Sequence, residues 1–182
     1  MRKYKKLSNP EKFIIKSIPL IFLFGSLFHF LYELSGERGI VGLFSAVNES
    51  VWEHLKMIVL PVVLFWCVYY FAKGRKYSID KNKWFTAALV SLVTALIAMP
   101  MIYYFYTQAF GVEIIAVDIA ILFIVLMFGQ LLGLHFYKYS KGMRWQIAVF
   151  TMILIIIVFM IFTYYPPKIP LFMDSQSGTY GI

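Results

Sequence analysis

The sequence predicts an all-α integral membrane protein that folds as a bundle of five transmembrane helices. Hydrophobic residues make up 61% of the 182 residues and charged residues 14%, whereas soluble domains are about 45–50% apolar and about 25% charged. Five apolar segments are each long enough for the roughly 20 helical residues that cross a bilayer. The chain does not show the period-2 alternation of an outer-membrane barrel.

We expect a single membrane domain over residues 1–182, with a tail after the last span at residues 166–182. Helices satisfy their own backbone hydrogen bonds in lipid, so each apolar segment is assigned as one helix. The spans are placed near residues 13–34, 51–72, 84–107, 114–137 and 145–165.

The first two spans carry most of the polar residues. The apolar part of the first span exceeds the 7–15 residues or so of a signal peptide and lacks a small-x-small cleavage site, so we expect a permanent helix. The second span has Asn48 as its expected N-cap and Glu49 in its first turn, where a carboxylate favours the helix dipole.

The last three spans are more uniform. Pro100 should kink the third span, and Gln130, in the middle of the fourth span, should bond to another helix. The fifth span must end before Pro166, Pro167 and Pro170, which cannot continue a helix. A tail packed over the bundle and a frayed terminus are both open for the residues that follow.

The positive charge predicts the orientation. All but three of the 17 basic residues lie in the N-terminal arm, in the connection between spans two and three, or in the connection between spans four and five; the exceptions are Arg38, Lys56 and Lys168. The positive-inside rule therefore places the N-terminus in the cytoplasm and the C-terminus outside. The formal net charge of +8 suits anionic lipid headgroups, and no motif suggests a nucleic-acid partner.

Ionisable residues gather at the expected outer ends of the first two spans. Glu49, Trp52, Glu53 and Lys56 recur at helical spacing and should share one face, with Asn48 and His54 beside it. Charged groups at membrane depth are costly and are usually kept for a function. We therefore expect a polar site here.

The end of the first span should complete this site. His29, Tyr32 and Glu33 fall on one stripe of the expected helix, and Asp118 lies about one turn inside the fourth span. The expected catalytic residues are His29, Glu33, Glu53, His54 and Lys56. The expected ligand-binding residues are Tyr32, Asn48, Glu49, Trp52 and Asp118.

Two kinds of chemistry are open for this site. His29, Glu33, Glu53 and His54 could hold zinc or a similar divalent metal, although Glu53 and His54 are adjacent and should point about 100° apart on a helix. Metal-free acid–base work is the alternative, because carboxyls in apolar surroundings bind protons more readily and a nearby His or Lys opposes this.

The segment from Val41 to Lys56, VGLFSAVNESVWEHLK, resembles the signature of an uncharacterised family of small prokaryotic multi-pass membrane proteins, a domain of unknown function. The terminal Gly178-Thr-Tyr-Gly181 and the five-span hydropathy resemble it too. The resemblance implies a plasma-membrane protein and implies no activity.

The function expected from the sequence is binding or modification of a lipid or small amphipathic molecule at the outer end of the bundle. A small transporter or proton pathway through Glu33, Glu53, Lys56 and Asp118 is one alternative. An accessory subunit of a membrane complex is another. Enzymatic activity and homo-oligomerisation are left open.

Overall fold

The computed structural model describes residues 6–182, and within them five helices are long and apolar enough to cross a membrane. They comprise α1 (Asn9–His29), α4 with α5 (Val51–His54 and Lys56–Lys73), α6 (Lys81–Phe110), α7 (Ile115–Tyr139) and α8 (Trp145–Tyr164). The five predicted spans are thereby confirmed as helices. Of the basic residues used to predict orientation, Arg2, Lys3 and Lys5 lie outside the described residues.

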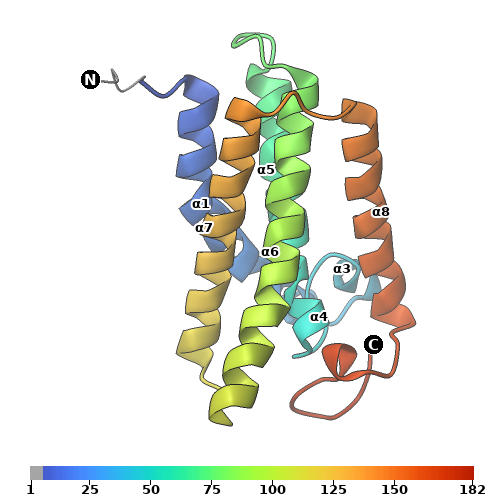
Figure 1. Ribbon diagram of the computed structural model, residues 1–182. Coiled ribbons are helices and arrows are strands. Elements are labelled where there is room, and N and C mark those ends of the chain that lie inside the picture. The colour runs from blue at the N-terminus through green and yellow to red at the C-terminus, as the bar shows by residue number, and fades with distance from the viewer. Residues whose placement is uncertain (1–5) are drawn as a thin grey trace.

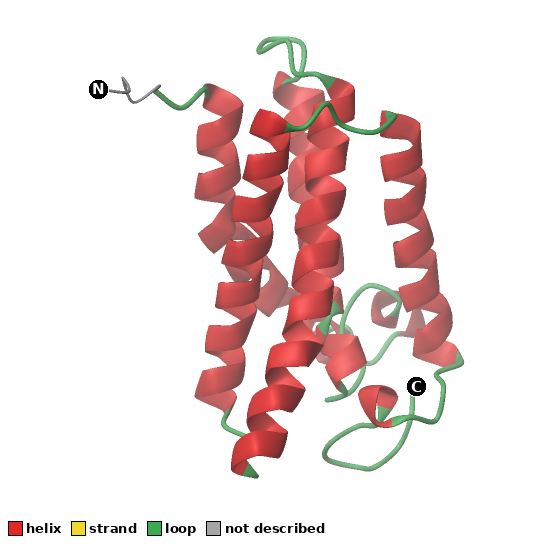
Figure 2. Ribbon diagram, viewed as in Figure 1, coloured by secondary structure: helices red, strands yellow, loops and turns green. Residues whose placement is uncertain are grey.

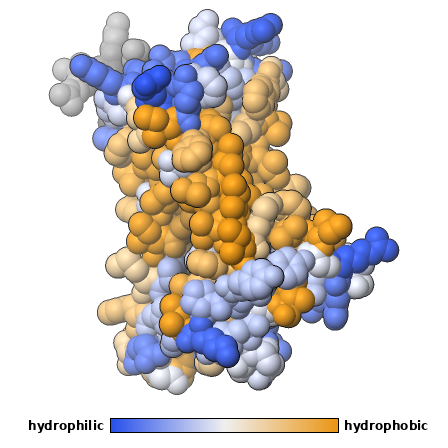
Figure 3. All heavy atoms as spheres, turned by 90° about the vertical axis from the view of Figure 1, so that its right-hand side faces the viewer, coloured by the Kyte–Doolittle hydropathy of each residue, from blue (hydrophilic) through white to orange (hydrophobic). Residues whose placement is uncertain are grey.

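The helices run roughly side by side, with α6 in the middle of the bundle, and the two ends of the chain lie at opposite ends of it (Figure 1). The connections at one end are short, whereas the other end holds the short helices α2 (Leu31–Leu34) and α3 (Gly39–Gly42), α4 and the C-terminal tail (Figure 2). We call this second end the tail end. An apolar belt separates the two more hydrophilic ends (Figure 3).

Glycines allow a close contact between α6 and α7. A Cβ placed on Gly129 of α7 would lie 2.6 Å from the Ser91 carbonyl oxygen of α6, and one on Gly133 would lie 2.8 Å from that of Ala87. Small residues allow such backbone contact between membrane helices. Gln130, between these glycines, accepts a 3.1 Å hydrogen bond from the Trp66 indole of α5, which confirms the expected bond to another helix.

The first span differs from the prediction because α1 ends at His29 rather than continuing to residue 34. The Ser45 hydroxyl donates to the Phe28 carbonyl at 2.5 Å and accepts from the Tyr32 amide at 3.1 Å. In an uninterrupted helix that amide would bond to that carbonyl directly. The inserted hydroxyl therefore breaks the helix at Phe30, and His29 and Glu33 do not share one continuous helix.

The part of the connection that contains Ser45 is buried in protein, whereas Ile40 and Phe44 of the same connection are exposed. Ser45 and Ala46 are 0% and 6% exposed. Irregular backbone at membrane depth needs such cover, because lipid cannot satisfy its hydrogen bonds.

The tail folds back over the tail end of the bundle. Its 3₁₀ helix η1 (Pro170–Phe172) buries Phe172 against Trp52 of α4, with ring centroids 4.6 Å apart. Met173 and Tyr180 pair as an isolated antiparallel bridge, and the Ile182 amide donates to the Thr163 carbonyl of α8 at 3.2 Å. Of the two alternatives left open by the sequence, the packed tail is the one observed.

Candidate functional site

The start of the second span decides where its polar side chains point. Ser50, and not Asn48, is the N-cap of α4, because its hydroxyl accepts from the Glu53 amide at 3.3 Å. The prediction for Asn48 was wrong. Its side-chain carbonyl accepts from the Ser50 amide at 3.0 Å, and its side-chain amide donates to the Gly181 carbonyl of the tail at 3.1 Å.

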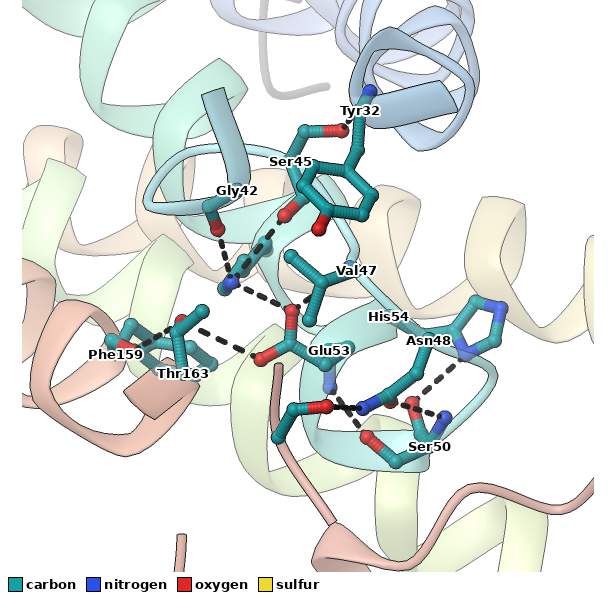
Figure 4. A network of polar contacts seen from close by, with 12 residues as sticks. Tyr32, Gly42, Ser45, Val47, Asn48, Ser50, Glu53, His54, Phe159 and Thr163 are labelled. Atoms are coloured by element: carbon teal, nitrogen blue, oxygen red, sulfur yellow. Dashed lines mark hydrogen bonds and ion pairs between the residues drawn. The ribbon is translucent and has the colours of Figure 1, made fainter. Parts of the chain in front are cut away.

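Glu53 and Lys56 form a buried ion pair, and each side chain is only 2% exposed. The Lys56 Nζ lies 2.5 Å from Glu53 Oε2, 2.6 Å from the Gly42 carbonyl and 3.2 Å from the Ser45 carbonyl (Figure 4). An ammonium has three N–H donors, so these three acceptors use its full capacity.

The Glu53 carboxylate has further partners. Its Oε2 accepts from the Val47 amide at 3.1 Å, and its Oε1 accepts from the Thr163 hydroxyl of α8 at 3.4 Å. The pair thus joins α4 and α5 to the loop before them and to α8. Its geometry is that of a scaffold, and neither residue is among the lining residues of the two cavities described below.

A second polar cluster lies on the other side of α4, where the His54 ring points away from the Glu53 carboxylate (Figure 4). The His29 Nε2 is 3.6 Å from Glu49 Oε1, and the His54 Nε2 is 3.3 Å from Glu49 Oε2. The two imidazole rings stack with centroids 5.0 Å apart and planes 22° apart. One ligand-type atom from each of the three residues lies within 4.8 Å of the other two.

Glu49 can serve both histidines because it precedes the helix. The sequence interpretation placed it on a helical face with Glu53, but α4 begins at Val51, and Glu49 is free to turn away. The hydrogen bond with His54 holds the pKa of the Glu49 carboxyl below its usual value, although partial burial opposes this. The Ser175 hydroxyl of the tail donates to the Glu49 backbone carbonyl at 3.3 Å.

The cluster lies at the wall of a cavity of about 650 Å³ between α1, α4, α5, α6 and α7. Its lining includes the apolar side chains of Met57, Met99, Ile115, Ile119 and Leu122. It also includes the polar side chains of His29, Glu49, His54, Tyr103, Glu113 and Asp118. The cavity therefore offers an apolar surface and a polar surface to the same occupant.

The remaining predicted residues are divided between three places. Asp118 lines the main cavity and accepts a hydrogen bond from the Tyr106 hydroxyl. Tyr32, Glu33 and Asn48 line a smaller neighbouring cavity of about 330 Å³, which shares His29 and Glu49 with the first. Trp52 stacks on Phe159 of α8 at 4.1 Å and on Phe172 of the tail.

The predicted metal set therefore differs from the observed cluster. Within residues 6–182, the structure groups Glu49 with His29 and His54, whereas Glu53 binds Lys56 and the exposed Glu33 follows the break in the first span. One signal in the sequence indicates that Glu49 can turn toward the histidines. Ser50 followed by Glu53 three residues later is a helix-capping pattern, which places Glu49 just before the helix.

Comparison with known proteins gives a family match. A family of unknown function (DUF6512) matches the chain over residues 1–182. No curated protein and no solved structure matches it.

Proposed function

The chain belongs to this family of unknown function over its whole length, and we propose, from the site itself, that the protein binds a lipid or small amphipathic molecule in the cavity at the tail end. The polar part of the ligand contacts His29, Glu49 and His54, and the apolar part lies against Met57 and Leu122.

The observation that carries this proposal is the mixed lining of the cavity, which contains both apolar and ionisable side chains. Its volume of about 650 Å³ lies within the 300–1,000 Å³ or so of small-molecule sites, which are mostly apolar with a few placed polar groups. The cavity is formed by helices that contact lipid, so an amphipathic ligand can enter with its apolar part still in the bilayer.

The charge pattern supports an assignment of this site to the outer side of the membrane. By the positive-inside rule the tail end faces outward, and the protein acts at the outer leaflet of a prokaryotic plasma membrane. Ligands are then drawn from that leaflet or from the medium.

Within this function Glu53 and Lys56 act as scaffold, and His29, Glu49 and His54 contact the ligand. Asp118 and Tyr103 are further polar residues of the cavity lining. If the protein also modifies its ligand, the two histidines and Glu49 are the groups placed to move a proton at the ligand's polar end.

Blocking the cavity tests the proposal. Ile119→Trp adds bulk to a residue that lines the cavity but is 53% exposed, so the core is spared. Ile124→Trp, at an exposed residue of α7 that is not among the lining residues, is the matched control. Binding of a fluorescent lysophospholipid by the purified protein in micelles should weaken at least tenfold in the first variant only. Equal binding by both variants would contradict the proposal.

A further inference from the structure

We propose that His29, Glu49 and His54 form a binding site for a divalent first-row transition metal ion, with Zn²⁺ preferred. Two imidazole nitrogens and a carboxylate are ligands that zinc commonly takes. The site stands on the geometry of these three side chains, and only the role of its open coordination position, given below, rests on the proposed function.

The distances fit ligands that share one ion. Zinc binds His nitrogen and carboxylate oxygen at about 2.0–2.2 Å, so two ligands in tetrahedral geometry lie about 3.3–3.5 Å apart. The two nitrogen-to-oxygen distances in the cluster are 3.3 Å for His54 and 3.6 Å for His29. Each histidine nitrogen therefore already lies close to the required spacing from one oxygen of Glu49, and one ligand atom from each of the three residues lies within 4.8 Å of the other two.

The hydrogen bond behind His54 fixes which nitrogen faces the site. Its Nδ1 lies 2.9 Å from the Ser50 carbonyl oxygen, which can only accept, so Nδ1 carries a proton. A backbone carbonyl behind the ring is a frequent partner of metal-binding histidines. Nε2 then faces Glu49 Oε2 at 3.3 Å, and either a proton, as in the hydrogen bond described above, or a metal ion can occupy the space between the two atoms.

A single divalent ion would be shared by both imidazole rings, which stack with centroids 5.0 Å apart, and by the Glu49 carboxylate that faces both Nε2 atoms. The neighbouring carboxylates of Glu33, Asp118 and Asp174 add negative potential around the three ligands.

The cluster leaves room for a further ligand. Zinc sites with three protein ligands keep a fourth position for water or substrate, and all three residues line the main cavity. The side chains of His29, His54 and Glu49 are 21%, 29% and 35% exposed. On the proposed function, this open position takes an oxygen atom of the ligand's headgroup.

Cobalt binding to the purified full-length protein tests the site, because tetrahedral Co²⁺ with nitrogen and oxygen ligands absorbs visible light and Zn²⁺ displaces it. The variants are His29→Ala, His54→Ala and the nearly isosteric Glu49→Gln. The control is His135→Ala, which removes the remaining histidine of the chain, on α7. Thermal melting in micelles checks that each variant is folded.

We expect one Co²⁺ per chain in the wild type and in the control, displaced by Zn²⁺. Each site variant should bind Co²⁺ more than about 100-fold more weakly, a larger effect than the 10–100-fold typical of outer-shell changes. The absence of tetrahedral Co²⁺ bands in the wild type would overturn the site. The site would also be overturned if folded Glu49→Gln bound Co²⁺ with wild-type affinity. This variant is the decisive test if the histidine variants do not fold.

The lysophospholipid assay separates this inference from the proposed function. A protein that binds the lipid but no Co²⁺ retains the proposed function and loses the metal site. A protein that binds Co²⁺ but no lipid retains the metal site, and its open position then has no assigned occupant.

Discussion

The imidazole rings of His29 and His54 stack with centroids 5.0 Å apart, although one ring ends the first membrane helix and the other belongs to the short helix α4. The contact depends on two irregularities of the backbone: the break after His29 and the start of α4 at Val51. The Ser45 hydroxyl holds the first irregularity in place, and the Ser50 cap fixes the second.

Removing one partner of the buried ion pair should destabilise the protein strongly. Lys56→Met leaves the Glu53 carboxylate buried without its cation and two loop carbonyls without a donor. The expected loss in the free energy of unfolding is about 3–5 kcal/mol, measured by denaturation in micelles. The double variant Glu53→Leu with Lys56→Met should recover part of this loss.

Lys138→Met is the matched control for that measurement. Lys138 pairs with Glu11 at 3.8 Å near the other end of the bundle, with its side chain 30% exposed. Partly exposed pairs contribute at most about 1 kcal/mol. A loss for Lys56→Met as small as that for Lys138→Met would contradict the scaffold role.

Ser45→Ala should lower stability by about 1–3 kcal/mol, because the Phe28 carbonyl and the Tyr32 amide lose the hydroxyl that joins them. It should also weaken Co²⁺ binding, since His29 is next to Phe28. Thr151→Ala is the control, because Thr151 is a partly exposed residue whose hydroxyl bonds to the Ile147 carbonyl of its own helix. Equal effects of the two changes would contradict this account of the break.

Gly129→Ala should also be destabilising, since its new Cβ would lie 2.6 Å from the Ser91 carbonyl and force α6 and α7 apart. Overpacking of this kind costs about 1–3 kcal/mol, again measured by denaturation in micelles. Ala120→Val adds bulk to an exposed position of the same helix and should leave stability unchanged. If both variants unfold at the wild-type denaturant concentration, the contact at Gly129 does not limit how closely α6 and α7 pack.

The tail should loosen in acid. Although partial burial opposes it, hydrogen bonds from the Ser177 hydroxyl and the Gln176 amide hold the pKa of Asp174 below its ordinary 3.8. A carboxyl with a lowered folded pKa stabilises the fold fully above its unfolded pKa, and the contribution disappears as the pH falls through the folded pKa. Below 3.8, pepsin should therefore begin to cleave the tail near Leu171.

Asp174→Asn is the control for the acid experiment. It cannot take up the proton, so its tail should be cleaved at pH values at which the wild-type tail is still protected. Identical cleavage of the two proteins at every pH would show that Asp174 does not hold the tail.

The sequence was sufficient for the helices and for the region of the site. Apolar length predicted the five spans, and the position of Gln130 predicted its bond to another helix. These features depend on the nearby sequence and on the thickness of the bilayer. His29 and His54 were also expected at similar depth, and the structure brings them together.

The partners within the site could not be predicted in the same way. Helical spacing placed both Glu49 and Glu53 on the face of Trp52, and similar expected depth grouped Glu53 with the histidines. In the structure Glu49, and not Glu53, contacts the histidines. Glu49 precedes the N-cap at Ser50, and Glu53 instead pairs with Lys56, which also binds two loop carbonyls. Such choices depend on contacts between distant segments, and a single sequence does not display them.

The hydroxyl of Ser45 has a consequence for how the chain enters the membrane. The break in the first helix depends on a residue that is synthesised after that helix is complete. While the first span is inserted alone, its Tyr32 amide is free to bond to the Phe28 carbonyl, and the helix can run on past His29. The final position of His29 is therefore set late in biogenesis, when the following connection docks, so the site is assembled only after the first two spans have met.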